Sequence, residues 1–219
     1  MILYLVYEFS FAEVSMQGVK WLFFDLGSTL LDESQVYEDI FRKIAISANV
    51  SEAIVNQKAV AFYKQNKRGD KEVARFFNVS FPEWEPKLEV LYAETKMLLK
   101  TLHDKYKIGI IANQLPGTEE RLQAFGIRKY IDVIAASSDE GVAKPDKRLF
   151  QIALEKADCA PEHAIMIGDR IDNDIVPAKE IGMRTIWIKQ GPGRYWEISC
   201  EKETPDYEVS SLSDLLKIL

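Results

Sequence analysis

Five short apolar runs, separated by stretches with helical patterns, constrain the fold of this chain more than any other feature of its sequence. The runs lie at residues 19–24, 106–112, 130–137, 163–168 and 183–188. They are rich in Ile and Val, which is typical of strands that are buried on both faces of a sheet. Helical patterns occupy residues 117–125, 146–157 and 173–181, and a short helix closes the chain. This alternation predicts an α/β fold built on a doubly wound parallel sheet.

The interval between the first two runs differs from the others because it carries only helical patterns. Breaks are expected at residues 68–70 and 78–86, and one long helix is expected at residues 87–104. A segment of this length is too long for an ordinary crossover between parallel strands. We therefore predict an all-helical cap at residues 34–95, inserted into a core that consists of residues 16–33 and 96–219.

The first fifteen residues stand outside this pattern. Their apolar run is far shorter than a membrane span requires. They include Glu8 and Glu13 but neither Lys nor Arg, so they lack the basic region of a signal peptide. Met16 would make a natural start on its own. We interpret residues 1–15 as an N-terminal extension or a misassigned start that carries no chemistry.

Composition and charge exclude several classes of function. Lys and Arg total 28 and Asp and Glu total 34, so the formal charge is −6 and no basic nucleic-acid surface is expected. Hydrophobic residues make up 47% and charged residues 28%, as in soluble globular proteins. The two cysteines form no CxxC motif and predict free thiols in a cytoplasmic protein. We expect neither nucleic acid nor membrane as a partner, and the sequence leaves the oligomeric state open.

Acidic residues follow several of the predicted strands, where open α/β sheets bind their ligands. Asp25 follows the first run, Asn113 the second, and Asp169 and Asp174 the fourth, while Lys144 lies between the third and the fourth. Each segment alone could be a turn or a helix start, but together they favour one shared site. Gathered carboxylates repel one another unless a hard cation such as Mg²⁺ binds among their oxygens. One of them could then act as a nucleophile.

Four segments resemble the motifs of the haloacid dehalogenase superfamily. They are "FFDLGSTL", "IGIIANQ", "GVAKPDKRLF" and "IMIGDRIDNDI", and the resemblance extends from about residue 18 to residue 219. The helical insert resembles the C1-type cap of this superfamily. The resemblance implies a Rossmann-like core, dependence on Mg²⁺ and, most often, hydrolysis of phosphate monoesters through an aspartyl phosphate.

The resemblance also implies roles for individual residues. Asp25 resembles the nucleophile and a metal ligand, and the backbone carbonyl of Gly27 would be a second ligand. Lys144 resembles the lysine that holds the nucleophile and the phosphate. Asp169 resembles the acidic metal ligand, with Asp174 as its supporting or water-mediated partner. The implied substrate is a small phosphorylated molecule.

Two positions depart from the pattern of the phosphatases in this superfamily. These enzymes usually have Asp where Gly27 stands, to protonate the leaving group and then activate water, and Ser or Thr where Ala112 stands, to bind the phosphoryl group. Asn113 could replace the second residue. Loss of a general acid and base costs about 10²- to 10⁴-fold in rate. The sequence therefore predicts a weak or specialised phosphatase, unless Asp32, Glu33 or a cap residue supplies the acid, and it predicts higher activity for Gly27→Asp.

Other functions within the same fold stay open at this point. The chain could be a catalytically degenerate binding or regulatory protein. The dehalogenases also lack the second Asp, but they do not use Mg²⁺. Because Asp169 resembles a metal ligand, its presence counts against that alternative. A phosphonate hydrolase would need a Schiff-base lysine from the cap, for which Lys58, Lys64 and Lys67 are candidates by location only.

Overall fold

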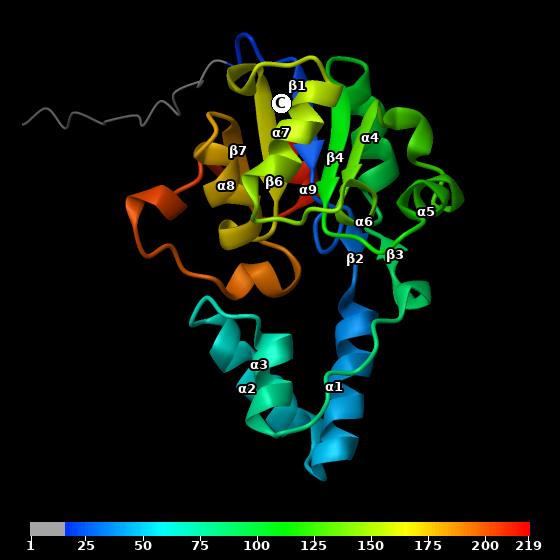
Figure 1. Ribbon diagram of the computed structural model, residues 1–219, viewed down its shortest axis with the longest axis vertical. Helices are drawn as coiled ribbons and strands as arrows, with labels where there is room; N and C mark the ends of the chain where they lie inside the picture. Colours follow the sequence, from blue (N-terminus) through cyan, green and yellow to red (C-terminus); the bar gives the residue numbers. More distant parts are fainter. Residues whose placement is uncertain (1–15) are drawn as a thin grey trace, which may run out of the picture.

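The computed structural model describes residues 16–219, so the predicted extension at residues 1–15 lies outside the described residues. A six-stranded parallel sheet forms the larger part of the molecule, in the order β5-β4-β1-β6-β7-β8 (Figure 1). The strands are β1 Trp21–Phe24, β4 Lys107–Ala112, β5 Val133–Ala136, β6 Ala164–Gly168, β7 Arg184–Ile188 and β8 Tyr207–Val209. The predicted doubly wound α/β fold is confirmed. The five predicted strands are present, and β8 is an edge strand that the sequence did not predict.

Side chains of β1 alternate between two cores, one on each face of the sheet. Leu22 and Phe24 belong to the core that is covered by α4, α5 and α9, whereas Phe23 belongs to the core that is covered by α7 and α8. The bounds of these helices are α4 Thr95–His103, α5 Thr118–Ala124, α7 Lys147–Lys156, α8 Val176–Lys179 and α9 Leu212–Leu215. Burial on both faces explains why the strands are apolar without interruption.

The central position of β1 determines where the functional residues meet. Phe24 is paired with Ile110 of β4 on one side and with Ile167 of β6 on the other. The pairing between β1 and β6 extends one residue beyond the end of β1, because the amide of Asp25 donates a hydrogen bond of 2.9 Å to the Ile167 carbonyl. Asp25 and Asp169 therefore emerge from neighbouring strands at the same edge of the sheet.

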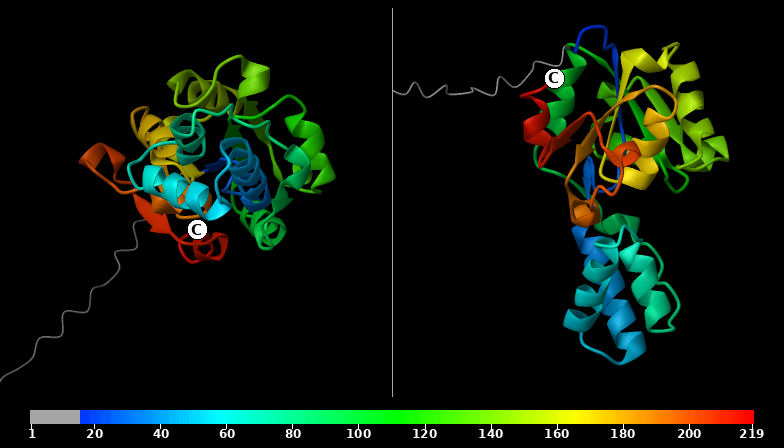
Figure 2. Two further views of the ribbon diagram at one scale, coloured as in Figure 1. Left: turned by 90° about the horizontal axis from the view of Figure 1, so that it is seen from below. Right: turned by 90° about the vertical axis from the view of Figure 1, so that its left-hand side faces the viewer.

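Three helices form a separate layer beyond this edge of the sheet (Figures 1 and 2). They are α1 Ser34–Ala48, α2 Glu52–Tyr63 and α3 Gly69–Phe76, and we call them the helical unit. They share their own apolar cluster, which includes Val36, Ile44 and Val55. Helix α3 approaches α2 closely at Gly69, where a Cβ atom would lie 2.8 Å from the Tyr63 ring.

The prediction of one long helix at residues 87–104 is wrong for the first half of this range. The chain instead forms a 3₁₀ turn, η1 Pro86–Leu88, and a short strand, β3 Val90–Leu91, before α4 begins. Strand β3 pairs antiparallel with β2 Leu31–Asp32, so the two connections to the helical unit form a ribbon. The Thr95 hydroxyl donates a hydrogen bond of 2.9 Å to the Leu30 carbonyl and fixes the start of α4. Tertiary pairing of this kind overrides local helix propensity.

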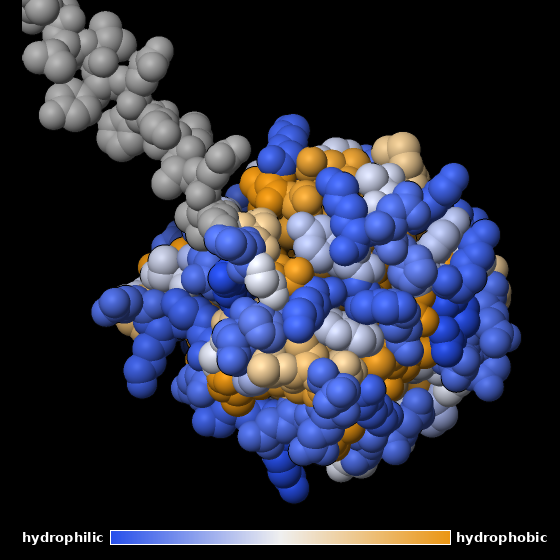
Figure 3. All heavy atoms as spheres, turned by 90° about the horizontal axis from the view of Figure 1, so that it is seen from above, coloured by the Kyte–Doolittle hydropathy of each residue, from blue (hydrophilic) through white to orange (hydrophobic). Residues whose placement is uncertain are grey.

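The remaining described elements are short. They are η2 Arg128–Tyr130, α6 Ser137–Glu140, η3 Pro161–His163, the π-helix η4 Ile171–Ile175, η5 Gly191–Tyr195 and η6 Glu201–Glu203. Cys159 and Cys200 are both free, as predicted. The face turned away from the helical unit is mostly hydrophilic, with apolar groups between the polar side chains (Figure 3). None of the described helices has the length and apolar character needed to cross a membrane.

Candidate active site

A buried lysine joins two carboxylates at the carboxyl edge of the sheet. The Lys144 ammonium donates hydrogen bonds of 2.6 Å to Oδ1 of Asp25 and 2.6 Å to Oδ1 of Asp174. Its side chain is only 1% exposed. Burial lowers the pKa of Lys144, but the carboxylates of Asp174 and Asp25 outweigh burial and raise it, so the lysine stays charged. The structure thus brings three of the predicted site residues together from segments distant in the sequence.

Asp169 completes an acidic cluster with Asp25 and Asp174. One carboxylate oxygen from each of the three residues lies within 4.8 Å of the others. Burial raises the pKa of the Asp25 carboxyl to about 6, and it raises that of Asp169 well above its ordinary value, with Asp174 adding repulsion in both cases. One ammonium group therefore does not balance three buried carboxylates. The donor set consists of oxygens at close range with excess negative charge, which fits a Mg²⁺ ion.

The two aspartates that follow β6 differ in how they are held. Both oxygens of Asp174 have protein partners, because Oδ2 accepts a hydrogen bond of 3.0 Å from the Arg170 amide and Oδ1 accepts from Lys144. The Asp169 carboxylate accepts no hydrogen bond from another side chain within residues 16–219. Asp169 is therefore free to bind a cation, whereas Asp174 is placed to support Lys144 and the loop.

Asn113 lies at the predicted place after β4, but its amide is engaged with Lys144. Oδ1 of Asn113 accepts a hydrogen bond of 2.8 Å from the Lys144 amide, and Nδ2 donates one of 2.9 Å to the Lys144 carbonyl. These two bonds fix the backbone that carries the buried ammonium group. Ser137, which the sequence did not single out, receives a hydrogen bond of 3.0 Å from the Gln114 amide and lines the same pocket.

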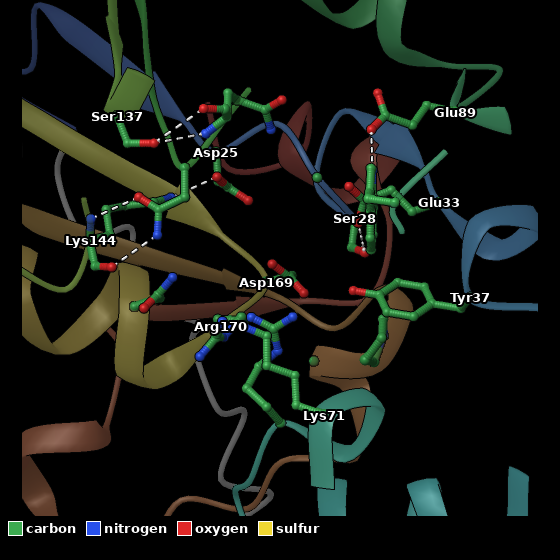
Figure 4. Close-up of a pocket in the computed structure, with 18 of the residues that line it drawn as sticks. Asp25, Ser28, Glu33, Tyr37, Lys71, Glu89, Ser137, Lys144, Asp169 and Arg170 are labelled. Carbon is green, nitrogen blue, oxygen red and sulfur yellow. Dashed lines mark hydrogen bonds and ion pairs between the residues drawn. The ribbon is translucent and has the colours of Figure 1, made fainter. Parts of the chain in front are cut away.

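The acidic cluster opens into a cavity of about 420 Å³ between the sheet and the helical unit. Figure 4 shows Asp25 and Lys144 on one side of this pocket and Ser28, Glu33 and Tyr37 on the other. The lining residues from the helical unit and from the segment that follows it are Tyr37, Tyr63, Arg68, Lys71, Phe81, Trp84 and Glu89. The pocket is therefore polar and cationic at its outer end and acidic at its inner end.

Glu33 occupies the space beside Gly27. A Cβ atom on Gly27 would lie 2.9 Å from Cδ and 3.0 Å from Oε2 of Glu33. The Glu33 carboxyl accepts a hydrogen bond of 2.9 Å from the Ser28 hydroxyl. Burial raises the pKa of this carboxyl to about 8, the Ser28 hydrogen bond lowers it, and Asp25 raises it further. Asp32, by contrast, accepts a hydrogen bond of 2.9 Å from the Ser34 amide and does not line this pocket.

The lysines proposed for a Schiff base lie elsewhere. Lys58, Lys64 and Lys67 are exposed and do not line the pocket of Asp25. The Lys58 ammonium lies 4.5 Å from the centroid of the Phe76 ring, and the Lys67 ammonium donates to Gln65. The pocket instead contains Lys71, from the start of α3.

Comparisons with known proteins agree with this arrangement. A family model described as haloacid dehalogenase-like hydrolase matches residues 22–188, which include all of the cluster. This chain belongs to the haloacid dehalogenase-like hydrolase family. A glyceraldehyde 3-phosphate phosphatase from Pyrococcus furiosus is 31% identical over 93% of this chain and 94% of its own. A glyceraldehyde 3-phosphate phosphatase from Methanocaldococcus jannaschii is 28% identical over 92% and 97%.

Solved structures of haloacid dehalogenase-like proteins share the fold. A predicted phosphoglycolate phosphatase from Haemophilus somnus has a TM-score of 0.68 and 21% identity, over 93% of this chain and 99% of its own. The putative hydrolase YfnB of Bacillus subtilis, bound to magnesium, has a TM-score of 0.63 and 22% identity, over 92% and 98%. Identity at this level establishes the fold of the family and nothing finer.

Proposed function

We propose that this chain is a Mg²⁺-dependent phosphatase of small phosphorylated metabolites, with Asp25 as the nucleophile. The observation that carries the proposal is the charged triad in which Lys144 bridges Asp25 and Asp174 beside the unpartnered Asp169. Relatives named as phosphatases over nearly the whole chain support the same reaction class. A binding protein would not need a buried lysine that holds a carboxylate at the open end of a sheet.

Asp25, Asp169 and the backbone carbonyl of Gly27 would hold the ion, and Mg²⁺, when bound, supplies the charge that neutralises the phosphoryl oxygens. Lys144 keeps Asp25 oriented and adds a positive charge next to the phosphoryl group. Asn113 fixes the Lys144 backbone, and its second Nδ2 hydrogen is available to a phosphoryl oxygen.

The reaction takes place in two steps at Asp25. A carboxylate oxygen of Asp25 attacks phosphorus and the bond to the leaving oxygen breaks, which yields an aspartyl phosphate and an alcohol. Water then attacks phosphorus, the bond to Asp25 breaks, and inorganic phosphate leaves. Each step also needs a proton to be delivered or removed.

The pocket supports a small, anionic substrate. Arg68 is already bonded to Asp70 at 2.6 Å and Arg170 to Asp172, whereas Lys71 has no carboxylate partner among residues 16–219. Lys71 is therefore the cation at the outer end that is available for a substrate. We propose that Lys71 binds a polar or anionic group at the end of the substrate opposite its phosphate.

Turnover of phosphate monoesters with added Mg²⁺ tests the proposed function. We expect hydrolysis of small sugar and acid phosphates that is lost with excess chelator and restored by Mg²⁺, because the carboxylate cluster needs a cation. The panel includes a 2-haloacid and a phosphonate. Turnover of either of these instead of the esters would contradict the proposal, and Mg²⁺ binding without any turnover would favour a regulatory protein.

Lys71→Ala tests the outer end of the pocket. We expect KM for the preferred substrate to rise roughly 5- to 30-fold, as for loss of one charge-assisted contact of about 1–2 kcal/mol, with little change in kcat. Lys67→Ala is the matched control, since Lys67 is exposed and outside the pocket. An unchanged KM for Lys71→Ala, measured by steady-state kinetics, would rule out this contact.

A further inference from the structure

Gly27 has no side chain, and the side chain of Glu33 occupies the space that a side chain at position 27 would fill. The Glu33 carboxyl lies where the first side-chain atoms of a larger residue 27 would be, with Cδ 2.9 Å from the position of a Cβ. Glu33 is 8% exposed and lines the pocket together with Asp25. The site therefore holds a carboxyl group beside the nucleophile, although it comes from a residue six positions further along the chain.

The local backbone keeps this carboxyl in place. Ser28 has a φ of 55°, in the left-handed region that non-glycine residues adopt at a cost. In this conformation its hydroxyl donates the 2.9 Å hydrogen bond to Oε2 of Glu33. Gly191 allows the close approach of the neighbouring loop, because a Cβ there would lie 2.6 Å from Oγ of Ser28. The carboxyl is thus positioned by the turn, by the loop and by the absence of a side chain on Gly27.

The other acids near the pocket are already engaged. Asp32 accepts the Ser34 amide and lies outside the pocket. Glu89 accepts a hydrogen bond of 2.8 Å from the Trp84 indole and pairs with Arg121 at 3.4 Å. Glu33 has one hydroxyl partner and no cation within salt-bridge distance among the described residues.

We propose that Glu33 is the general acid and base of this enzyme, replacing the residue that is missing at position 27. The proposal rests on the proposed phosphatase function. In the first step, the bond between phosphorus and the leaving oxygen breaks with its electron pair on oxygen, and that oxygen takes the proton of the Glu33 carboxyl. In the second step, the oxygen of a water molecule bonds to phosphorus while that water gives a proton to the Glu33 carboxylate. The bond between phosphorus and the Asp25 oxygen breaks. Glu33 is then protonated again, and the products are an alcohol and inorganic phosphate.

The first test is Glu33→Gln with two substrates in rapid-quench kinetics. The variant keeps the size of Glu33 and can still accept from Ser28. With p-nitrophenyl phosphate, whose leaving group needs no proton, we expect a burst of about one nitrophenol per enzyme and then turnover slowed roughly 10²- to 10⁴-fold, with phosphorylated enzyme accumulating. With an alkyl phosphate we expect a similar loss in rate and no burst, because the first step itself is slow.

The second test introduces an acidic side chain at position 27. Gly27→Asp alone forces two carboxyl groups into one space, so we expect activity below that of the wild type. The sequence-based expectation of a gain assumed that this space was empty. In Gly27→Asp/Glu33→Ala the space is free, and we expect activity on alkyl phosphates at least 10-fold above that of Glu33→Ala. Asp32→Asn is the control for a neighbouring acid and should resemble the wild type.

The outcomes separate this inference from the proposed function. If no phosphate ester is hydrolysed, or if hydrolysis survives the loss of Asp25, both fail. If hydrolysis depends on Asp25 but Glu33→Gln turns over alkyl phosphates within about 3-fold of the wild type, only the role of Glu33 is overturned. Slowing of both substrates without a burst would also overturn it, since that pattern indicates a structural role.

Discussion

Asp25→Asn is expected to abolish phosphate release. The amide keeps the shape of the side chain and can still accept a hydrogen bond from Lys144, but it cannot form an aspartyl phosphate. Loss of a nucleophile in other hydrolases lowers kcat by roughly 10⁴- to 10⁶-fold, and we expect a loss in this range. The measurement is release of inorganic phosphate from the best substrate at saturating Mg²⁺.

A trapping experiment makes this prediction specific. Acid-quenched enzyme should carry label from ³²P-labelled p-nitrophenyl phosphate when Asp25 is present, most of all in Glu33→Gln, and none in Glu33→Gln/Asp25→Asn. Asp104→Asn carries the same change at the exposed end of α4 and serves as the control. Labelled protein, or activity above 1% of the wild type, in a variant without Asp25 would remove this residue as the nucleophile.

The fold was predictable because parallel strands that are buried on both faces leave a continuous apolar signal. β4 and β6 are buried almost throughout and were found from the sequence to within one residue at each end. β8 was missed because Tyr207–Val209 is short and only Val209 is buried. The start of α4 was misplaced because Val90–Leu91 forms a strand only through its pairing with β2.

The acidic half of the candidate site was predictable for a topological reason. Residues that follow neighbouring parallel strands must lie at the same edge of the sheet, so Asp25 and Asp169 were expected to meet. Lys144 was singled out by its position between the third and fourth predicted strands, its role came from the resemblance to a family motif, and the structure places its ammonium between two carboxylates. The metal and the catalytic roles remain predictions that the experiments above test.

The other half of the site could not be predicted because it depends on how turns and layers fold back. Glu33 reaches the space beside Gly27 only because Ser28 adopts a left-handed conformation, and Glu33 was one of several acids that the sequence left open. Lys71 lines the pocket only because the helical unit folds so that the start of α3 faces this cavity. The one local sign of that placement is Gly69, whose lack of a side chain permits the contact with Tyr63.

Lys144→Met is expected to destabilise the fold as well as to abolish activity. The Lys144 and Asp174 side chains are each 1% exposed, so removal of the ammonium leaves Asp174 buried without its counter-charge and next to Asp25. Breaking a buried pair on one side costs about 3–5 kcal/mol in the free energy of unfolding. Urea denaturation in the presence of chelator measures this loss at neutral pH.

A double-mutant cycle separates the charge effect from packing. In Lys144→Met/Asp174→Asn both members of the pair are neutral, so we expect the double variant to be more stable than Lys144→Met alone. Lys147→Met is the matched control, because Lys147 is half exposed and pairs with Glu180 at the surface; we expect a change of about 0.5 kcal/mol or less. Addition of Mg²⁺ should reduce the loss in Lys144→Met, because a cation bound to the carboxylates replaces part of the missing charge. A loss below about 1 kcal/mol in Lys144→Met would show that the buried lysine does not hold the acidic cluster together.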